Sequence, residues 1–382
     1  MSYKIKKHLK NIETPIYVCE EELLENNLKL LKSIQDETNI KILLALKGFA
    51  FSPLLNMITK YLKGSCASGL YEAKYAKEFV GGEIHTYSPA FKESEFEEIA
   101  NLSNHIVFNN FNQLSKYIDK IKSSNSIGFR INPEVSTVDV DIYNPCGVYS
   151  RLGTTKKEFE KSDKSLLKYI DGFHFHALCE QDSDALDTVL QKFELNFKEY
   201  FKDLKWVNFG GGHHITKKDY DIERLIKIIK EFKNRYPHLE VYMELGEAVG
   251  WQTGTLVGTI LDITKNDIDI AILDVSAEAH MPDTLAMPYT PEVLGGKIGS
   301  ELKYKYRFAG NSCLAGDIIG DYSFNEPLKV GDKVVFEDQI HYTIVKNNTF
   351  NGIKLPNLGV LYKDGTFKVE KEFGYEEYRD RN

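Results

Sequence analysis

The stretch KILLALKG, residues 41–48, places five apolar residues between two lysines and then ends in a glycine. A short apolar run of this kind is typical of a strand buried in a parallel sheet. Lys47 stands where the chain leaves that strand, and a charged side chain is unusual beside a buried core. The stretch therefore predicts a core strand, and it raises the question of what a lysine does at its end.

Seven more apolar runs follow at intervals along the chain. The eight runs span residues 41–47, 63–68, 82–88, 105–110, 126–132, 172–177, 206–211 and 241–246. Intervening segments such as 70–79, 185–201 and 222–236 place Leu, Ile, Phe and Ala at helical spacing, with Lys and Glu on the other face. Eight strands alternating with helices predict an α/β fold, a parallel (β/α)8 or TIM barrel.

After about residue 260 the pattern changes to strand-like stretches with Gly, Asp and Asn turns. The stretches expected as strands are 253–263, 267–276, 328–338 and 341–346. They indicate a mostly antiparallel β-domain, which the strand-like PIYVCE at residues 15–20 could join. We expect the barrel to cover residues 23–257 and the β-domain to consist of 1–22 and 258–382.

Composition and charge exclude several classes of protein. No apolar run approaches the ~20 residues that a membrane helix needs, and no apolar segment makes the basic N-terminus a signal peptide. A formal net charge of −8 without a basic stripe argues against a nucleic-acid partner. The five cysteines are scattered and form no CxxC pair, which favours free thiols in a cytoplasmic protein.

Polar residues at the ends of the barrel strands are the candidates for function, because the loops that follow these strands build the active site of such a barrel. The candidates are Lys47, His174, His176, Gly210, Gly211, Gly212, Glu244, Gly246 and Glu247. Each alone has an ordinary explanation, such as an exposed lysine, a core histidine, a turn or a surface ion pair. Their expected convergence at one rim makes a functional explanation stronger.

Together these residues suit the cofactor pyridoxal 5'-phosphate. Lys47 would bind the cofactor aldehyde, and partial desolvation would favour its neutral, nucleophilic amine. The glycines Gly210–Gly212 would let backbone N–H groups approach the phosphate. Glu244 would keep the pyridine nitrogen protonated, so that the ring acts as an electron sink. This role explains why a core strand ends in a lysine.

The chain resembles a known family over nearly its whole length, the pyridoxal-phosphate decarboxylases of the ornithine, arginine and diaminopimelate group, which have an alanine-racemase-like architecture (fold type III). Six segments resemble family motifs: ALKG (45–48), GFHFHALCE (172–180), NFGGG (208–212), ELGE (244–247), NSCLAGD (311–317) and HYTIVKNNTFNG (341–352). The motifs follow one another in the family's order, which makes the resemblance specific.

The resemblance implies roles for individual residues. His176 would lie over the cofactor ring, Tyr342 near the phosphate and Arg130 along the cofactor pocket. The unit would be a homodimer with shared active sites, to which the partner subunit contributes Cys313. Either Cys313 or Lys47 would protonate the carbon that loses CO2.

Departures from the family pattern bear on the substrate. The family's EPGR arginine is Glu247 here, which is either a solvated rim residue or a partner for a substrate amine. The specificity region, residues 274–292, lacks the arginine that diaminopimelate enzymes use for a distal carboxylate, and it contains His280 and Asp283. With Asp317, these residues suit an extended amine. The chain thus resembles the branch that acts on carboxylated polyamines, with meso-diaminopimelate or another basic amino acid as the alternative.

Three other functions fit parts of the pattern. A racemase on this fold typically has an arginine at the pyridine nitrogen, and Glu244 argues against it. A zinc hydrolase could use the histidines at 174–176 and 213–214, but its HxH pair would be expected on the first strand, so we expect no metal. A regulator without activity would not need Lys47 and Cys313.

Overall fold

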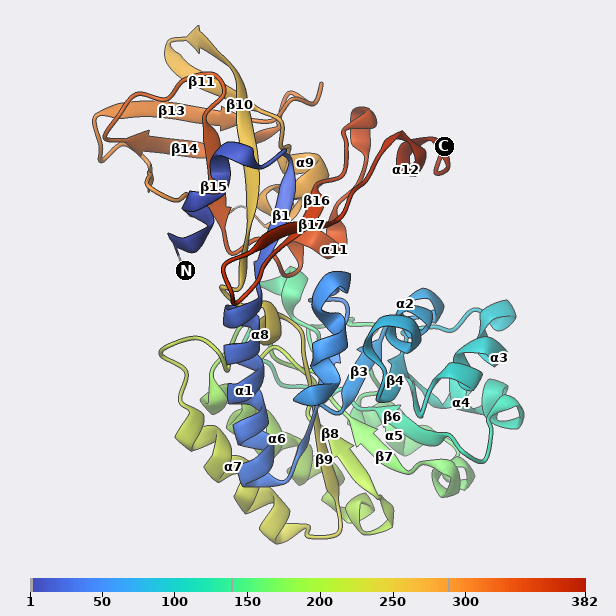
Figure 1. Ribbon diagram of the computed structural model, residues 1–382. Coiled ribbons are helices and arrows are strands. Elements are labelled where there is room, and N and C mark those ends of the chain that lie inside the picture. Colours follow the sequence, from blue (N-terminus) through green and yellow to red (C-terminus); the bar gives the residue numbers. More distant parts are fainter. Residues whose placement is uncertain (1–2, 139, 288) are drawn as a thin grey trace. The chain divides into compact units, whose positions relative to one another are not determined.

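The computed structural model describes residues 3–138, 140–287 and 289–382. Two compact units divide the chain (Figure 1). One consists of Asn27–Gly48 and Leu55–Val249, and the other of Met1–Asn26, Phe49–Leu54 and Gly250–Asn382. The domain boundaries expected at residues 23 and 257 stay a prediction, because a compact unit is not by itself a domain that folds alone.

Eight parallel strands of the first unit close into a barrel in sequence order, as predicted. The strands are β2 (Lys41–Ala45), β3 (Gly64–Ala67), β4 (Glu83–Tyr87), β5 (His105–Phe108), β6 (Ser126–Arg130), β7 (Gly172–His174), β8 (Trp206–Asn208) and β9 (Glu240–Leu245). β9 closes the barrel on β2, where Glu244 lies opposite Leu43. All eight apolar runs therefore contain barrel strands.

Helices connect the barrel strands. The helical elements between residues 21 and 250 are α1 (Glu21–Thr38), η3 (Ser52–Lys60), α2 (Leu70–Tyr75), η4 (Ala76–Val80), α3 (Glu93–Leu102), α4 (Phe111–Tyr117), η5 (Ile118–Lys120), η6 (Asp141–Tyr143), α5 (Lys156–Lys161), η7 (Lys164–Tyr169), α6 (Ser183–Phe197), η8 (Lys198–Asp203), α7 (Ile222–Arg235) and α8 (Glu247–Gly250). In α7 the side chains of Leu225, Ile229 and Phe232 are buried at helical spacing. The helix begins where the Asp221 carboxylate accepts a hydrogen bond from the Arg224 N–H.

The amino-terminal end of the barrel interior is filled by a packed polar network. The Lys41 ammonium bonds Glu83, Glu240 and the Tyr242 hydroxyl at 3.0–3.1 Å. The rings of His85 and His105 stack with centroids 3.8 Å apart. Although Glu83 and the two histidines are close enough to share a metal ion, the ammonium beside Glu83 already neutralises that carboxylate. Lys41 thus connects β2 to β4 and β9 at this end of the barrel.

The second unit is built on a mostly antiparallel sheet, as predicted, in the order β12-β14-β13-β11-β10-β1-β16-β17, with β15 also paired to β10. Its strands are β1 (Ile16–Glu20), β10 (Gly254–Asn266), β11 (Ile268–Leu273), β12 (Lys297–Ile298), β13 (Tyr304–Ala309), β14 (Ile318–Phe324), β15 (Lys333–Glu337), β16 (Asn357–Leu361) and β17 (Phe367–Lys371). β1 lies between β10 and β16, which confirms that the first strand joins the late sheet.

The short helices of the second unit include one correction. They are η1 (Tyr3–Lys7), η2 (Leu9–Asn11), α9 (Ala277–His280), α10 (Asp283–Ala286), α11 (Thr343–Lys346), η9 (Phe350–Gly352) and α12 (Tyr375–Arg379). The expected strand at 341–346 is wrong, because Tyr342 has φ +45° and α11 begins directly after it. Across the described residues, no helix combines the length and apolarity needed to span a bilayer.

Candidate active site

The carboxyl ends of the barrel strands meet at one rim, where polar side chains gather. In chain order from β2 to β9, the residues within two positions of the strand ends include Lys47, Cys66, Tyr87, Asn109, Arg130, His174, Asn208 and Glu244. A ring of functional groups at this rim is the arrangement that active sites of parallel barrels use.

Glu244 lies at the centre of this ring. Its Oε1 accepts a hydrogen bond from Asn208 Nδ2 at 2.8 Å, and its Oε2 lies 3.8 Å from His174 Nε2. Burial alone would raise the pKa of the Glu244 carboxyl. The His174 ring, the Asn208 amide and the Lys47 ammonium lower it by more than burial raises it, so the net pKa lies below its usual range. Glu244 is therefore ionised at neutral pH.

His176 is held as a neutral ring of one tautomer. Its Nδ1 accepts a hydrogen bond from the Gly211 N–H at 2.8 Å, so Nε2 carries the proton of the neutral ring. Burial and the charges of Lys47 and Arg130 hold the pKa of His176 well below its usual range. Since β7 ends at His174, the bond to Gly211, and not strand alternation, orients His176.

His174 is almost fully enclosed at the rim. It is 1% exposed, and neither ring nitrogen has a hydrogen-bond partner among the described residues. Burial lowers the pKa of His174 to about 4, so the ring is neutral at pH 7. A buried ring with unused nitrogens is costly in a finished core, so His174 marks a place where further polar groups are expected.

The glycine turn 210–212 is dictated by close backbone contacts. A Cβ at Gly211 would lie 2.0 Å from the Glu244 carbonyl oxygen, and one at Gly212 would lie 2.0 Å from that of Leu178. Gly210 and Gly212 also have φ of +70° and +85°. The N–H of Gly210 donates to Asn208 Oδ1 at 2.8 Å. Within the described chain, the Gly212 N–H has no acceptor and remains for an anion.

Gly246 brings the turns after β9 and β2 together. A Cβ at Gly246 would lie 3.0 Å from the Gly48 Cα, and one at Gly48 would lie 2.9 Å from the Gly246 Cα. Neither position tolerates a larger residue without a shift of backbone. The two glycines therefore place the turn that carries Lys47 beside the turn that follows Glu244.

Lys47 differs from its prediction in one respect. β2 ends at Ala45, and the Gly48 N–H donates to the Ala45 carbonyl at 3.0 Å, so Lys47 lies in a tight turn with its side chain exposed. The expectation that the strand itself holds Lys47 is wrong, and the partial desolvation of its amine stays a prediction. The charge of Lys47 nonetheless influences the pKa values of Glu244 and His176, which places the amine within their reach.

Sequence reasoning missed Cys66 and Asn208. Burial and the neighbouring Glu244 carboxylate raise the pKa of the Cys66 thiol well above its usual range, so the thiol is protonated. Both residues are strand-end residues inside apolar runs, and the rule that selected Lys47 and Glu244 could have selected them. The role of Arg130 had been left to the family resemblance, and here its guanidinium lies 4.5 Å from the Tyr87 ring centroid.

Glu247 lies at the rim beside other polar groups. Its Oε2 is 3.0 Å from His214 Nε2, and Glu180 is close enough that one ion could bind all three side chains. His213 is instead buried beside the Tyr220 hydroxyl at 3.4 Å, and burial lowers its pKa to about 3. The rim thus carries two carboxylates that could bind a cation or an amine.

The remaining candidates lie in the second unit, on three connected segments. Asp317 accepts hydrogen bonds from the N–H groups of Ala277 at 2.7 Å and Ser312 at 3.2 Å. The Cys313 N–H donates to Asn351 Oδ1 at 2.7 Å. These bonds bring together the expected specificity region, the cysteine motif and the 341–352 segment, and the Cys313 side chain is exposed there.

Several of these residues already have protein partners. His280 is fully buried, with Nδ1 accepting from the Ser276 N–H at 3.2 Å and Nε2 lying 3.0 Å from the Lys354 carbonyl. The Asp283 carboxylate bonds Lys346 at 2.7 Å, and the Lys346 ammonium lies 5.3 Å from the Tyr342 ring centroid. His280 thus stabilises this loop whatever its part in recognition, and Asp283 would have to share its charge.

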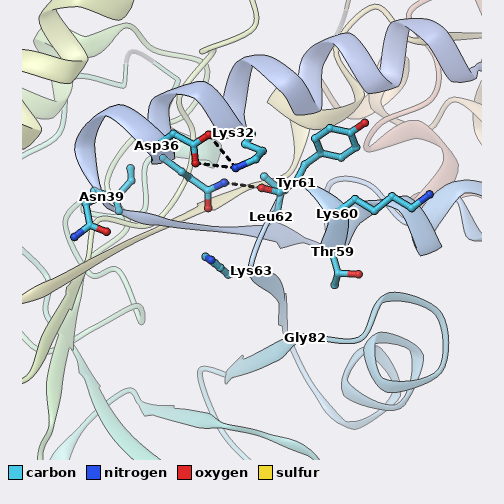
Figure 2. Close-up of a pocket in the computed structure, with 11 residues that line it drawn as sticks. Lys32, Asp36, Asn39, Thr59, Lys60, Tyr61, Leu62, Lys63 and Gly82 are labelled. Carbon is cyan, nitrogen blue, oxygen red and sulfur yellow. Dashed lines mark hydrogen bonds and ion pairs between the residues drawn. The ribbon is translucent and has the colours of Figure 1, made fainter.

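A cavity of about 460 Å³ lies elsewhere in the barrel unit and contains none of the candidates. Figure 2 shows it between α1 and the segment 59–63. The Gln35 amide donates to the Tyr61 carbonyl at 2.7 Å, and Lys32 pairs with Asp36 at 2.7 Å. Four of its lining residues thus bond one another in pairs, and the candidate residues lie at the strand rim.

Comparison with known proteins identifies what this chain is similar to. The model of the family described as pyridoxal-dependent decarboxylase, C-terminal sheet domain, matches residues 16–339. A carboxynorspermidine/carboxyspermidine decarboxylase of Campylobacter jejuni is 54% identical over 97% of this chain and 99% of its own. A carboxyaminopropylagmatine decarboxylase of Synechocystis is 44% identical over 98% and 96%.

A solved structure agrees with these relatives. The crystal structure of a Campylobacter jejuni carboxynorspermidine decarboxylase complexed with norspermidine superposes with a TM-score of 0.91 at 53% identity. The alignment covers 97% of this chain and 100% of that one.

The rim residues fit pyridoxal 5'-phosphate, the cofactor of this family. Lys47 offers an exposed amine, the Gly212 N–H has no other acceptor in the described chain, and Glu244 is an ionised carboxylate. When bound, the cofactor supplies an aldehyde for the amine and a ring that accepts the electrons left by CO2. The chain therefore belongs to the pyridoxal-dependent decarboxylases.

Proposed function

We propose that the protein decarboxylates carboxynorspermidine, carboxyspermidine or both, and so forms norspermidine or spermidine in polyamine biosynthesis. The observation that carries the proposal is the acidic rim, where Glu247 replaces the family's arginine and Glu180 lies beside it. A polyamine brings several ammonium groups, and carboxylates at a partly desolvated rim are suitable partners for them. The Campylobacter jejuni relative with 54% identity is named for the same substrates.

Each residue of the candidate site has its own role in the proposed reaction. Lys47 would anchor the cofactor, and Glu244 would hold its ring nitrogen protonated. The His176 ring, which is neutral because its pKa is lowered, would pack on the cofactor ring without adding a charge. The Gly212 N–H would donate to the phosphate, Gly246 would keep the turns after β9 and β2 together, and Tyr342 is assigned to the phosphate by the family resemblance. Asp283, His280 and Asp317 shape the amine site, and Glu247 binds an amine directly.

Carboxyaminopropylagmatine is the second candidate substrate, because the 44% identical Synechocystis relative is named for it. Its guanidinium would meet the same acidic rim. meso-Diaminopimelate is a weaker candidate, since its distal carboxylate would face Glu247 and the specificity region 274–292 offers it no arginine. A desolvated carboxylate without a cationic partner is costly.

CO2 release by the purified protein tests the proposal directly. Carboxynorspermidine, carboxyspermidine, carboxyaminopropylagmatine and meso-diaminopimelate are compared in one assay by kcat/KM. We expect the two carboxylated polyamines to be best, and to differ from each other by no more than about 10–200-fold, because one methylene is worth about 1–3 kcal/mol in a pocket. A preference for meso-diaminopimelate would contradict the substrate assignment and leave the fold and cofactor intact.

Glu247→Gln is expected to raise KM for carboxynorspermidine about tenfold, because a charge-assisted contact to an ammonium becomes a neutral one. The kcat should change less, since Glu247 is assigned to binding and not to the bond that breaks. Glu231→Gln, an exposed substitution on α7, serves as the control. An unchanged kcat/KM in Glu247→Gln would show that Glu247 is only a rim residue.

We further infer a cytoplasmic homodimer in which Cys313 of one subunit completes the site that contains Lys47 of the other. In support, all five cysteines are free thiols and Cys313 is exposed. Lys47→Ala and Cys313→Ala are each expected to be nearly inactive. Mixing them under subunit exchange should restore about a quarter of wild-type activity, because half of the dimers are mixed and one of their two sites is intact.

Two outcomes of the mixing experiment would contradict the proposed homodimer with shared sites. If the mixture stays as inactive as its parents although sedimentation shows mixed dimers, Cys313 and Lys47 do not act in one shared site. If the wild-type protein sediments as a monomer at assay concentrations, the homodimer itself is wrong.

A further inference from the structure

Asn208 occupies a position that connects two parts of the rim. It is the last residue of β8 and is 0% exposed. Its Nδ2 donates to Glu244 Oε1 at 2.8 Å, and its Oδ1 accepts from the Gly210 N–H at 2.8 Å. Because a backbone N–H can only donate, the amide oxygen must face Gly210 and the amide nitrogen must face Glu244.

We propose that Asn208 is a positioning residue, which fixes the Glu244 carboxylate in one orientation and couples it to the glycine turn. The proposal rests on the role proposed for Glu244 at the pyridine nitrogen. No other residue has been assigned to orienting Glu244, because Lys47, His176 and the glycines are assigned to the aldehyde, the ring and the phosphate of the cofactor.

The surroundings of Glu244 show why such a residue is needed. The charged and polar groups around it are His174 on β7, Cys66 on β3, Lys47 after β2 and Asn208 on β8, and His85 on β4 acts on its pKa from deeper in the barrel. The His174 Nε2 lies 3.8 Å away, beyond hydrogen-bond distance. Asn208 therefore makes the 2.8 Å bond that holds Oε1, and the neighbouring Cys66 thiol also interacts with this carboxylate.

The neutral amide also suits the charge of Glu244. A donor at 2.8 Å stabilises the ionised carboxylate without adding a group that titrates. An aspartate at this position would instead place a second carboxylate against the first, and one of the two would then bind a proton more tightly. Asn208 is thus the side chain of its size that donates to Glu244 and still accepts from Gly210.

Two substitutions separate the two bonds. Asn208→Ala removes both. Asn208→Asp keeps the acceptor for the Gly210 N–H but replaces the donor to Glu244 by a like charge. Asn125→Ala is the matched control, because Asn125 donates to the Ala100 and Ser103 carbonyls just before β6, at the other end of the barrel.

The readouts are the dissociation constant of the apoenzyme for pyridoxal phosphate, the pH dependence of the bound cofactor's absorbance, kcat, KM and Tm. For Asn208→Ala we expect roughly tenfold weaker cofactor binding and a kcat that falls more than KM rises. For Asn208→Asp we expect a lower kcat whose acidic limb moves to higher pH. Asn125→Ala should lower Tm without changing cofactor affinity or the pH profile.

The outcomes distinguish this inference from the role of Glu244. If Glu244→Gln alters kcat and the absorbance profile but both Asn208 variants keep wild-type values apart from a lower Tm, Asn208 is only structural. If Asn208→Ala does not fold, Asn208→Asp decides, and wild-type kcat and acidic limb would overturn the proposal. If Glu244→Gln itself changes nothing, the role of Glu244 fails and this inference fails with it.

Discussion

Lys47→Ala is expected to lower the rate of CO2 release by at least about 10³-fold, because it removes both the cofactor anchor and a candidate proton donor. Lys47 lies in the turn closed by Gly48, and its charge lowers the pKa values of Glu244 and His176. In the part of the chain that the structure describes, no other lysine lies within two residues after a barrel strand. The measurement is kcat with carboxynorspermidine at saturating cofactor.

A second readout tests the anchor without turnover. Borohydride reduction of the wild-type holoenzyme should fix the cofactor to the Lys47 peptide, which mass spectrometry detects after digestion. Lys63→Ala is the matched control, since Lys63 is also exposed and precedes β3 at the other end of the barrel. Cofactor fixed to a different peptide, or full activity of Lys47→Ala, would contradict the assignment.

Glu244→Gln is expected to lower kcat by about 10²-fold, a typical loss for a positioned group that controls a proton. Glutamine keeps the shape of the side chain and the oxygen that accepts from Asn208, so the loss reports the charge. The lowered pKa of Glu244 has a consequence for pH. The carboxylate is ionised above its pKa, so wild-type activity should persist into mildly acidic solution and fail only as pH falls through that depressed value.

The matched control for this variant is Glu240→Gln on the same strand. Glu240 pairs with Lys41 at the amino-terminal end of β9, so its loss should affect stability and not kcat. The two variants are compared by kcat, cofactor absorbance and Tm. Equal kcat values in Glu244→Gln and Glu240→Gln would remove Glu244 from the proposed mechanism.

The barrel could be predicted from sequence because its strands are buried on both faces and therefore read as continuous apolar runs. The same logic failed where one face of a strand is exposed. YKYRFA at β13 mixes aromatic and basic residues, and only part of the strand is buried. The prediction therefore missed β13, although it recognised the neighbouring β11. In contrast, 341–346 has a β-branched pattern but forms α11, where tertiary contacts such as Lys346 with Asp283 decide the local structure.

Sequence reasoning also found some residues of the candidate site and missed others. Lys47 and Glu244 could be found because a charge at the end of an apolar run is conspicuous. Asn208 and Cys66 also stand near the end of an apolar run, but they were missed because a neutral residue in that position is less conspicuous than a charged one. The exposure of Lys47 was also beyond sequence reasoning, since it depends on where β2 ends within the run 41–47.

The position of β1 constrains the order in which the protein can be completed during synthesis. β1 is made first, yet it pairs with β10 and β16, of which β16 leaves the ribosome near the very end. At a synthesis rate of about 5–20 residues per second, β1 stays without its β16 partner for a time on the order of tens of seconds. The barrel, encoded between them, can close meanwhile. A tag fused close to Ile16 would therefore hinder the late pairing of β1 with β10 and β16, whereas a tag after Asn382 would not affect β1.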